Sequence, residues 1–221
     1  MIAALEDGIK DIWKLVIGTE IPFNPPSRPF LTKLRASQKV LCVAVTRPAS
    51  CSTKKGTKPL LVTGHPDNTV TVWDVSSGEK KAILSEKSKQ EITAIAIYDP
   101  EPSGSSPRVI AASRDKSVTI WLVNSSARAK YKLTGSGHSD VITAIAVYPG
   151  QGLGSALIVT ASADRSAIIW KLETGERVGA LRGAHTRRLN CLAIYTPLQT
   201  RAQNEASCNP LVLTAGDDRS V

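Results

Sequence analysis

The chain has 221 residues, of which 42% are hydrophobic and 21% are charged, a balance that excludes bulk disorder and allows a folded core. Its net charge of +9 favours contact with anionic partners. An aromatic content of only 5% argues against base stacking on single-stranded nucleic acid. No apolar run approaches roughly 18 residues, so the sequence predicts no transmembrane segment.

Cysteine usage and the N-terminal residues bear on the class of protein and its compartment. The four cysteines include no CxxC pair, so the sequence supports neither a disulfide framework nor a zinc ribbon. The first residues, MIAALEDGIKDIW (1–13), carry acidic side chains early and lack the basic-then-apolar order of a signal peptide. We therefore expect an intracellular protein, cytoplasmic or nuclear.

One short pattern recurs along the chain, in which an aspartate precedes a tryptophan by six positions. Its copies are DGIKDIWKL (7–15), DNTVTVWDV (67–75), DKSVTIWLV (115–123) and DRSAIIWKL (164–172). The chain ends within a further copy, DDRSV (217–221). The aligned aspartates are Asp7, Asp67, Asp115, Asp164 and Asp218. A period of roughly fifty residues indicates a repeat architecture.

Three further kinds of run recur between these segments, and their Val, Ile and Thr residues favour strands. The first is apolar on both faces: VLCVAV (40–45), ITAIAI (92–97), ITAIAV (142–147) and LNCLAI (189–194). The second ends in small residues: PLLVTG (59–64), RVIAAS (108–113), ALIVTA (156–161) and PLVLTA (210–215). The last reads KKAIL (80–84), AKYKL (129–133) and ERVGAL (176–181). With the Asp-to-Trp segment, each unit holds four short strands, and no window favours a helix. The first run must be covered on both faces, as when its sheet lies between two others.

This organisation resembles the WD-repeat β-propeller family, through Gly137-His138, Trp73-Asp74 and the Asp-to-Trp hairpin of every unit. The resemblance implies an all-β fold of propeller blades with four antiparallel strands, named a to d, in about four blade equivalents. The expected boundaries are strands c and d of a first blade in 1–20, a Pro-rich insert in 21–39, full blades in 40–85, 86–134 and 135–182, and strands a and b of a truncated blade in 183–221. The chain is then either a piece of a larger propeller, which we favour, or a four-bladed ring closed by its two ends.

In this family a hydrogen-bond network often joins the His before strand a, the Asp of the b–c turn, a Ser or Thr of strand b and the strand-c Trp. The resemblance implies one complete set: His138, Ser162, Asp164 and Trp170. The last unit contributes His185 and Asp218. The two earlier units contribute Asp67 with Trp73, and Ser113 with Asp115 and Trp121, but have Ala36 and Ser88 where the His belongs. We interpret His65 as a solvated turn residue.

The d–a loops and b–c turns of such a fold share one face, and this sequence places many cations there. The candidate partner-binding residues are Lys39, Arg114, Lys116, Arg165, Arg187, Arg188 and Arg219. No nucleophile, phosphate-loop or metalloprotease motif is present, so we predict no enzyme, cofactor or metal site. The expected function is a non-catalytic scaffold that binds protein or peptide partners in a larger assembly. The alternative is an anion-binding module for RNA, acidic lipid or a phosphorylated peptide.

Overall fold

The computed structural model describes residues 36, 38–46, 59–75, 77–85, 90–100, 106–123, 129–133, 137–150, 156–195 and 210–221. The strands predicted in 1–20 lie outside the described residues, as do most of the insert predicted in 21–39 and the position of Ser88. Within the described ranges the secondary structure consists of strands, and no helix there could cross a membrane.

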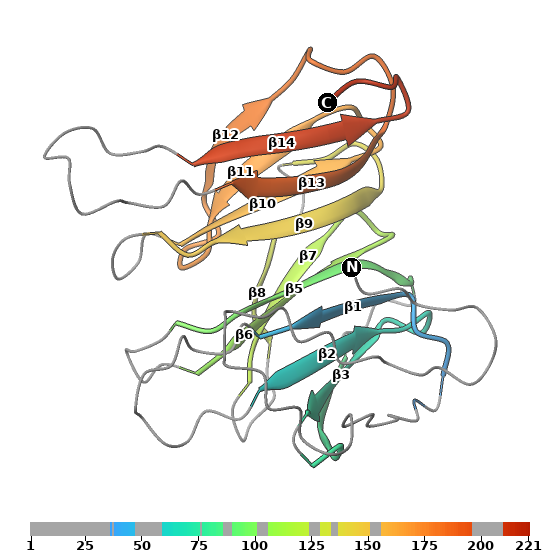
Figure 1. The fold of residues 1–221 in the computed structure, drawn as a ribbon, viewed down its shortest axis with the longest axis vertical. Coiled ribbons are helices and arrows are strands. Elements are labelled where there is room, and N and C mark those ends of the chain that lie inside the picture. The colour runs from blue at the N-terminus through green and yellow to red at the C-terminus, as the bar shows by residue number, and fades with distance from the viewer. Residues whose placement is uncertain are drawn as a thin grey trace, which may run out of the picture.

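In the described part of the chain, fourteen strands form three four-stranded sheets and one two-stranded sheet, all antiparallel (Figure 1). The first sheet is β1 (Cys42–Val45), β2 (Leu60–Gly64), β3 (Thr69–Asp74) and β4 (Lys80–Ser85). The second is β5 (Ile92–Tyr98), β6 (Arg108–Ser113), β7 (Val118–Leu122) and β8 (Ala129–Leu133). The third is β9 (Ile142–Tyr148), β10 (Leu157–Ser162), β11 (Ala167–Lys171) and β12 (Arg177–Leu181). The last contains β13 (Leu189–Tyr195) and β14 (Leu211–Gly216). Strand order follows chain order in every sheet, so the predicted all-β blade fold is confirmed.

Each turn between the second and third strands is closed by its aspartate. Asp67 Oδ1 accepts hydrogen bonds from the Thr69 amide at 3.1 Å and the Thr69 hydroxyl at 2.6 Å. Asp164 holds Ser166 in the same way, at 3.0 and 2.6 Å. A short polar side chain that bonds the backbone two residues on favours a tight reversal. This local chemistry explains why the Asp-to-Trp pattern predicted hairpins correctly.

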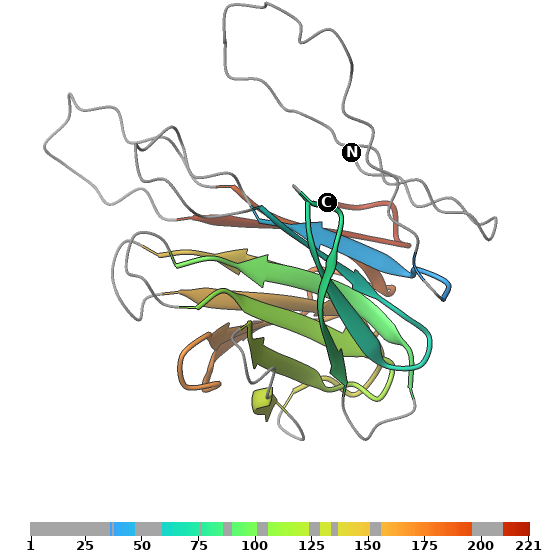
Figure 2. The same cartoon turned by 90° about the horizontal axis from the view of Figure 1, so that it is seen from below.

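The sheets stack through their first strands, with β1 against β5, β5 against β9, and β9 against β13. Figure 1 shows the stack rising from β1–β3 to β13–β14, and Figure 2 shows the twist of each sheet from below. Ile110 and Ile120 of the second sheet pack with Ile158 and Trp170 of the third, all at most 4% exposed. A fully buried side chain of this size stabilises the fold by about 1.5–3 kcal/mol, so burial between neighbouring sheets fixes the stack.

Candidate partner-binding site

One end of the stack, which we call the top face, gathers two kinds of segment. The first strands are preceded by entry loops (38–41, 90–91, 137–141 and 182–188), and the second strands are followed by aspartate turns (65–68, 114–117, 163–166 and 217–220). Backbone hydrogen bonds tie the loop to the turn in the second, third and last blades, as from the Arg114 amide to the Glu91 carbonyl at 2.9 Å and from the Asp217 amide to the Arg188 carbonyl at 3.0 Å. In the first blade the side chain of His65 makes this link, with Nδ1 at 2.9 Å from the Lys39 carbonyl. The entry loop and the aspartate turn are therefore joined in each of the four described blades.

Thr160 is the centre of a buried hydrogen-bond network in the third blade. Its hydroxyl lies 2.9 Å from His138 Nε2 and accepts a hydrogen bond from Trp170 Nε1 at 3.0 Å. His138 Nδ1 lies 3.0 Å from Asp164 Oδ2. Because a carboxylate can only accept, Nδ1 carries the ring proton. The network runs Asp164–His138–Thr160–Trp170 and joins the entry loop to three elements of its own blade.

The sequence-based prediction gave the position of Thr160 to Ser162, and the structure places Ser162 elsewhere. The Ser162 hydroxyl donates to the Asp140 carbonyl at 3.0 Å and accepts from the Asp164 amide at 3.1 Å. Ser113 has the same role in the second blade, with the Gln90 carbonyl at 3.2 Å. Both serines face the same side of their strand as the residue two positions earlier. The sequence pattern therefore fits Ser162 and Thr160 equally well, and the interatomic distances show that Thr160 joins the network.

The charges of this network are tuned by burial and hydrogen bonding. Burial lowers the pKa of His138 below its ordinary 6.5, against the opposing effect of the Asp164 carboxylate. Burial raises the pKa of Asp164, but hydrogen bonds from Ser166 and the Ser139 amide, with the charge of His138, outweigh it and hold that pKa below 3.8. The folded chain therefore favours neutral His138 beside ionised Asp164.

The free energy of unfolding is expected to fall as the pH is lowered. Because the folded-state pKa of His138 is depressed, the unfolded chain binds its proton first, and stability is lost as the pH falls below about 6.5. Asp164 adds a second loss below about pH 4, since its folded-state pKa is also depressed. Urea unfolding of the wild type and His138→Gln at several pH values between 7.5 and 5.5 tests the first step. A slope equal in both proteins would contradict it.

The last described blade repeats the arrangement with its own residues. His185 Nδ1 lies 3.1 Å from Asp218 Oδ1, and Nε2 lies 2.9 Å from Thr214 Oγ1. The hydrogen bond from Ser220 and that with His185 hold the pKa of Asp218 well below its ordinary range. Thr63, Thr160 and Thr214 occupy one register position, which we call the central threonine, and the second blade has Ala111 there.

The first blade corrects the interpretation of His65 as a solvated turn residue. Its side chain is buried at 3% exposure, with Nε2 at 3.1 Å from both Thr63 Oγ1 and Thr71 Oγ1. Nδ1 lies 2.9 Å from the Lys39 carbonyl, and Trp73 Nε1 donates to Thr63 Oγ1 at 3.0 Å. His65 thus supplies from the aspartate turn the imidazole that His138 supplies from its entry loop.

The remaining network residues that the sequence singled out are placed as follows. Asp67 accepts from Gln38 Nε2 at 2.6 Å and from Thr69, and Asp115 accepts from the Ser117 amide at 3.0 Å. Trp121 is 1% exposed and packs in the core between the first two blades. Each of the three histidines has both ring nitrogens engaged by protein atoms, so their lone pairs and protons serve the fold.

Gly137, the residue before His138, is required by close packing. A Cβ at Gly137 would lie 2.8 Å from Cη2 of the Trp170 ring, and the indole is held by its hydrogen bond to Thr160. Gly137→Ala is therefore expected to lower the free energy of unfolding by about 2 kcal/mol through overpacking. Gly179→Ala is the matched control, because no atom lies within 4 Å of a Cβ there. Equal urea midpoints for the two variants would exclude the clash.

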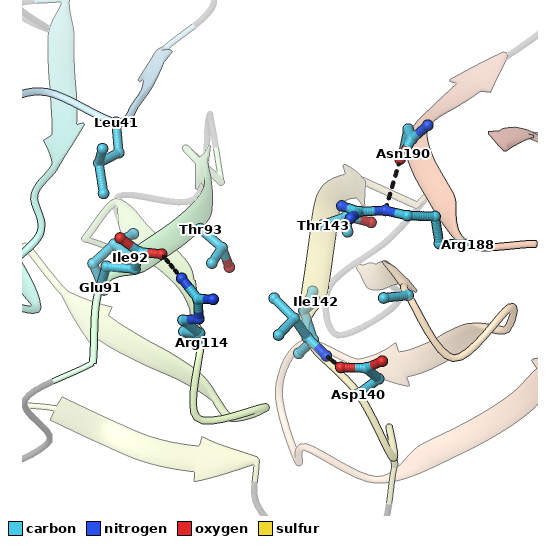
Figure 3. A pocket seen from close by; sticks show the side chains of 12 residues that line it. Leu41, Glu91, Ile92, Thr93, Arg114, Asp140, Ile142, Thr143, Arg188 and Asn190 are labelled. Atoms are coloured by element: carbon cyan, nitrogen blue, oxygen red, sulfur yellow. Dashed lines mark hydrogen bonds and ion pairs between the residues drawn. The ribbon is translucent and has the colours of Figure 1, made fainter. Parts of the chain in front are cut away.

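A pocket of about 530 Å³ opens on the top face where the first strands converge. Its lining comes from all four blades, and Figure 3 shows the labelled side chains around it. The residues are Leu41, Glu91, Ile92, Thr93, Arg114, Asp140, Val141, Ile142, Thr143, Ala163, Arg188 and Asn190. Sequence reasoning named Arg114 and Arg188 for this face but did not predict the pocket. The sequence feature that could have indicated the pocket is the uncharged residue at one position of each first-strand segment: Leu41, Thr93, Thr143 and Asn190.

Two ion pairs flank the pocket, and the acidic and basic residues occupy opposite positions in the two pairs. In the second blade Arg114 Nη1 donates to Glu91 Oε1 at 2.6 Å, and in the last blade Arg188 Nε lies 3.9 Å from Asp217 Oδ2. The entry-loop position is acidic in the first pair and basic in the second. Between them the third blade contributes apolar Val141, Ile142 and Ala163. The pocket therefore combines a small apolar patch with two half-exposed guanidinium groups and the carboxylates of Glu91 and Asp140.

The other predicted partner-binding residues lie on the rim of this face. Lys39 is exposed, and its carbonyl holds His65. Lys116 Nζ donates to the Ser139 carbonyl of the next blade at 2.6 Å. Arg165, Arg187 and Arg219 are exposed, and their side chains make no hydrogen bond or ion pair with another described residue. The structure thus brings the predicted cations to one face but neutralises some of them.

Comparisons with known proteins agree with this architecture. Residues 129–171 match the sequence model of the family described as WD domain, G-beta repeat. The chain is 26% identical over 213 residues to the nuclear distribution protein nudF of Emericella nidulans, covering 87% of this chain and 41% of nudF. It is 31% identical over 157 residues to protein tipD of Dictyostelium discoideum, covering 71% of this chain and 20% of tipD. The chain thus spans less than half of either relative.

A solved structure gives the same answer for the fold. The crystal structure of the RRP9 WD40 repeats aligns with a TM-score of 0.56 at 22% identity, covering 72% of this chain and 43% of that one. Together with the blade order and the repeated networks, these matches assign the family. The chain belongs to the WD-repeat family of β-propeller proteins.

Proposed function

We propose that the chain is a non-catalytic scaffold that binds a peptide segment of a protein partner in the top-face pocket. One observation carries the proposal: a single pocket is lined by loops and strand ends of all four blades. Such a site exists only when the blades are stacked, so it is a property of the whole assembly of sheets.

The chemistry of the pocket suits a polypeptide ligand. Val141 and Ala163 are half-buried and offer a small apolar surface for a side chain, above the buried Ile142. Arg114 and Arg188 retain N–H donors beyond those engaged with Glu91 and Asn190, and these can meet backbone carbonyls. A ligand site with an apolar surface and a few convergent polar groups is typical of a binding pocket. The histidines support a non-catalytic role, since both nitrogens of each ring are used by the blade networks. An intracellular location remains a prediction from the sequence.

Selection from a displayed library of random peptides of about twelve residues tests the proposal. Peptides enriched on the wild type are expected to bind at least about tenfold more weakly to Ala163→Gln, whose longer side chain fills the pocket. The equivalent position in the second blade already holds Arg114, so the fold accepts a long side chain there. Ile83→Gln, at a side chain 55% exposed on β4, is the control. Equal binding to all three proteins, or no enriched peptide, would overturn the proposal.

A further inference from the structure

The aspartate turns of the third and last blades and the entry loop of the last blade carry three arginines that form no ion pair with a described residue. We define the arginine sector as Arg165, Arg187 and Arg219. All three side chains are exposed, and none makes a hydrogen bond or ion pair with another described residue. These three cations differ from Arg114 and Lys116, which are engaged with Glu91 and the Ser139 carbonyl. Their donors are free to meet an anion.

The carboxylates nearest to the sector in sequence are already engaged. Asp164 accepts from the Ser139 amide and from Ser166. Asp218 accepts from the Thr186 amide at 2.8 Å and from Ser220. Asp217 accepts from Asn190 Nδ2 and lies 3.9 Å from Arg188. These internal hydrogen bonds hold the three carboxylates in place, so the carboxylates form no ion pair with the sector arginines.

The repeat itself shows that the sector departs from the pattern of the neighbouring junction. Lys116 reaches the Ser139 carbonyl, and the next residue is the acidic Asp140. One blade later the equivalent residues are Arg165 and Arg187. The junction of the second and third blades thus has residues of opposite charge at these two positions, and the junction of the third and last blades has two positive ones. Like charges brought together raise the local positive potential and attract an anionic ligand.

The four aspartate turns share one backbone conformation. The residue after the aspartate lies in the left-handed region in each of them, with φ of 62° at Asn68, 70° at Lys116, 69° at Arg165 and 65° at Arg219. Asparagine adopts this region more readily than a long side chain does. Asparagine at position 165 or 219 is therefore expected to preserve the turn.

We infer that the arginine sector binds an acidic polypeptide segment that continues from a ligand in the pocket, an inference that rests on the proposed function. The sector adjoins the pocket, because Ala163 and Arg188 line the pocket and lie two residues and one residue from Arg165 and Arg187. Carboxylates or phosphates on such a segment would receive charge-assisted hydrogen bonds from the guanidinium groups. The described top-face segments hold no Phe, Trp or Tyr, so they offer neither stacking surfaces for bases nor aromatic anchors for a membrane interface.

The test uses variants taken from the chain's own equivalent positions. Arg165→Asn and Arg219→Asn copy Asn68, and Arg187→Gln copies Gln38 and Gln90. The control triple variant, Lys80→Gln, Lys81→Gln and Lys171→Gln, removes the same charge from outside the top face. The probe is a fluorescein-labelled peptide of about twelve residues rich in Glu and Asp, measured by fluorescence anisotropy. A uridine oligonucleotide of similar length and phosphatidylserine vesicles are parallel probes.

The acidic peptide is expected to bind the wild type and the control within about twofold of each other, and the sector variant at least about tenfold more weakly. Its affinity should fall steeply as salt is raised, because exposed charges are screened. Equal binding to wild type and sector variant would overturn the inference, as would tighter sector-dependent binding of the oligonucleotide or the vesicles. If library peptides still lose affinity in Ala163→Gln, the proposed function stands while the acidic partner falls. If neither Ala163→Gln nor the sector variant weakens binding, both the proposed function and the acidic partner are overturned.

Discussion

Thr160→Val is expected to lower the free energy of unfolding by about 3 kcal/mol. The substitution keeps the shape of the side chain but removes the hydroxyl that meets His138 and Trp170. Thr160 and Trp170 are buried at 0% and 4% exposure, so water does not replace the lost partner. Each buried polar group left unsatisfied costs about 1–3 kcal/mol. Urea unfolding followed by tryptophan fluorescence measures the change.

The matched control is Ser162→Ala, on the same face of the same strand. Ser162 bonds only its local loop and turn, so its loss should cost about 1 kcal/mol. A larger effect for Ser162→Ala than for Thr160→Val would restore the sequence-based assignment of Ser162 to the network. The comparison therefore decides which hydroxyl links the histidine to the tryptophan.

His65→Ser is expected to cost about 3 kcal/mol, although the residue lies in a turn. Serine is present at the equivalent positions Ser113 and Ser162, so the backbone accepts it. The loss removes the contacts with Thr63, Thr71 and the Lys39 carbonyl. It also leaves a cavity beside the central threonine, which adds to the cost. Urea unfolding of the variant measures the change.

A second substitution tests why His65 matters. Ala36 occupies the entry-loop position equivalent to His138 and packs against Leu61 and Trp73. Ala36→His in the His65→Ser background should regain at least half of the lost stability, since the ring then reaches Thr63 from the usual side. Ala36→Leu in the same background supplies bulk without ring nitrogens and should regain less. Equal recovery by both would show that His65 fills space and makes no network.

The strands and their order could be predicted because local chemistry repeats. Asp67 and Asp164 bond the residue two positions on in the same way, and the apolar runs alternate with turns at a fixed spacing. Alignment by position also predicted His138 and His185 beside their aspartates, where the structure places them.

The same alignment failed where a residue at one position of the blade takes the network role that the family pattern gives to another position. His65 is two residues before its aspartate, not in the entry loop, so position alone could not reveal that its ring meets Thr63. The threonine shared by Thr63, Thr160 and Thr214 is visible in the aligned runs, but a serine two residues later faces the same side in one of them. The pocket depends on side chains from four blades, and their separations follow from packing between sheets rather than from any local pattern.

Nuclear magnetic resonance mapping of a library-selected peptide tests whether a partner binds in the top-face pocket. We expect the amide resonances perturbed at saturation to belong to Leu41, Thr93, Thr143 and Asn190 and to the aspartate turns beside them, and Ala163→Gln to abolish the shifts. Perturbations centred instead on the outer strands β4 and β12, with the top face unchanged, would contradict a partner site built where the blades converge.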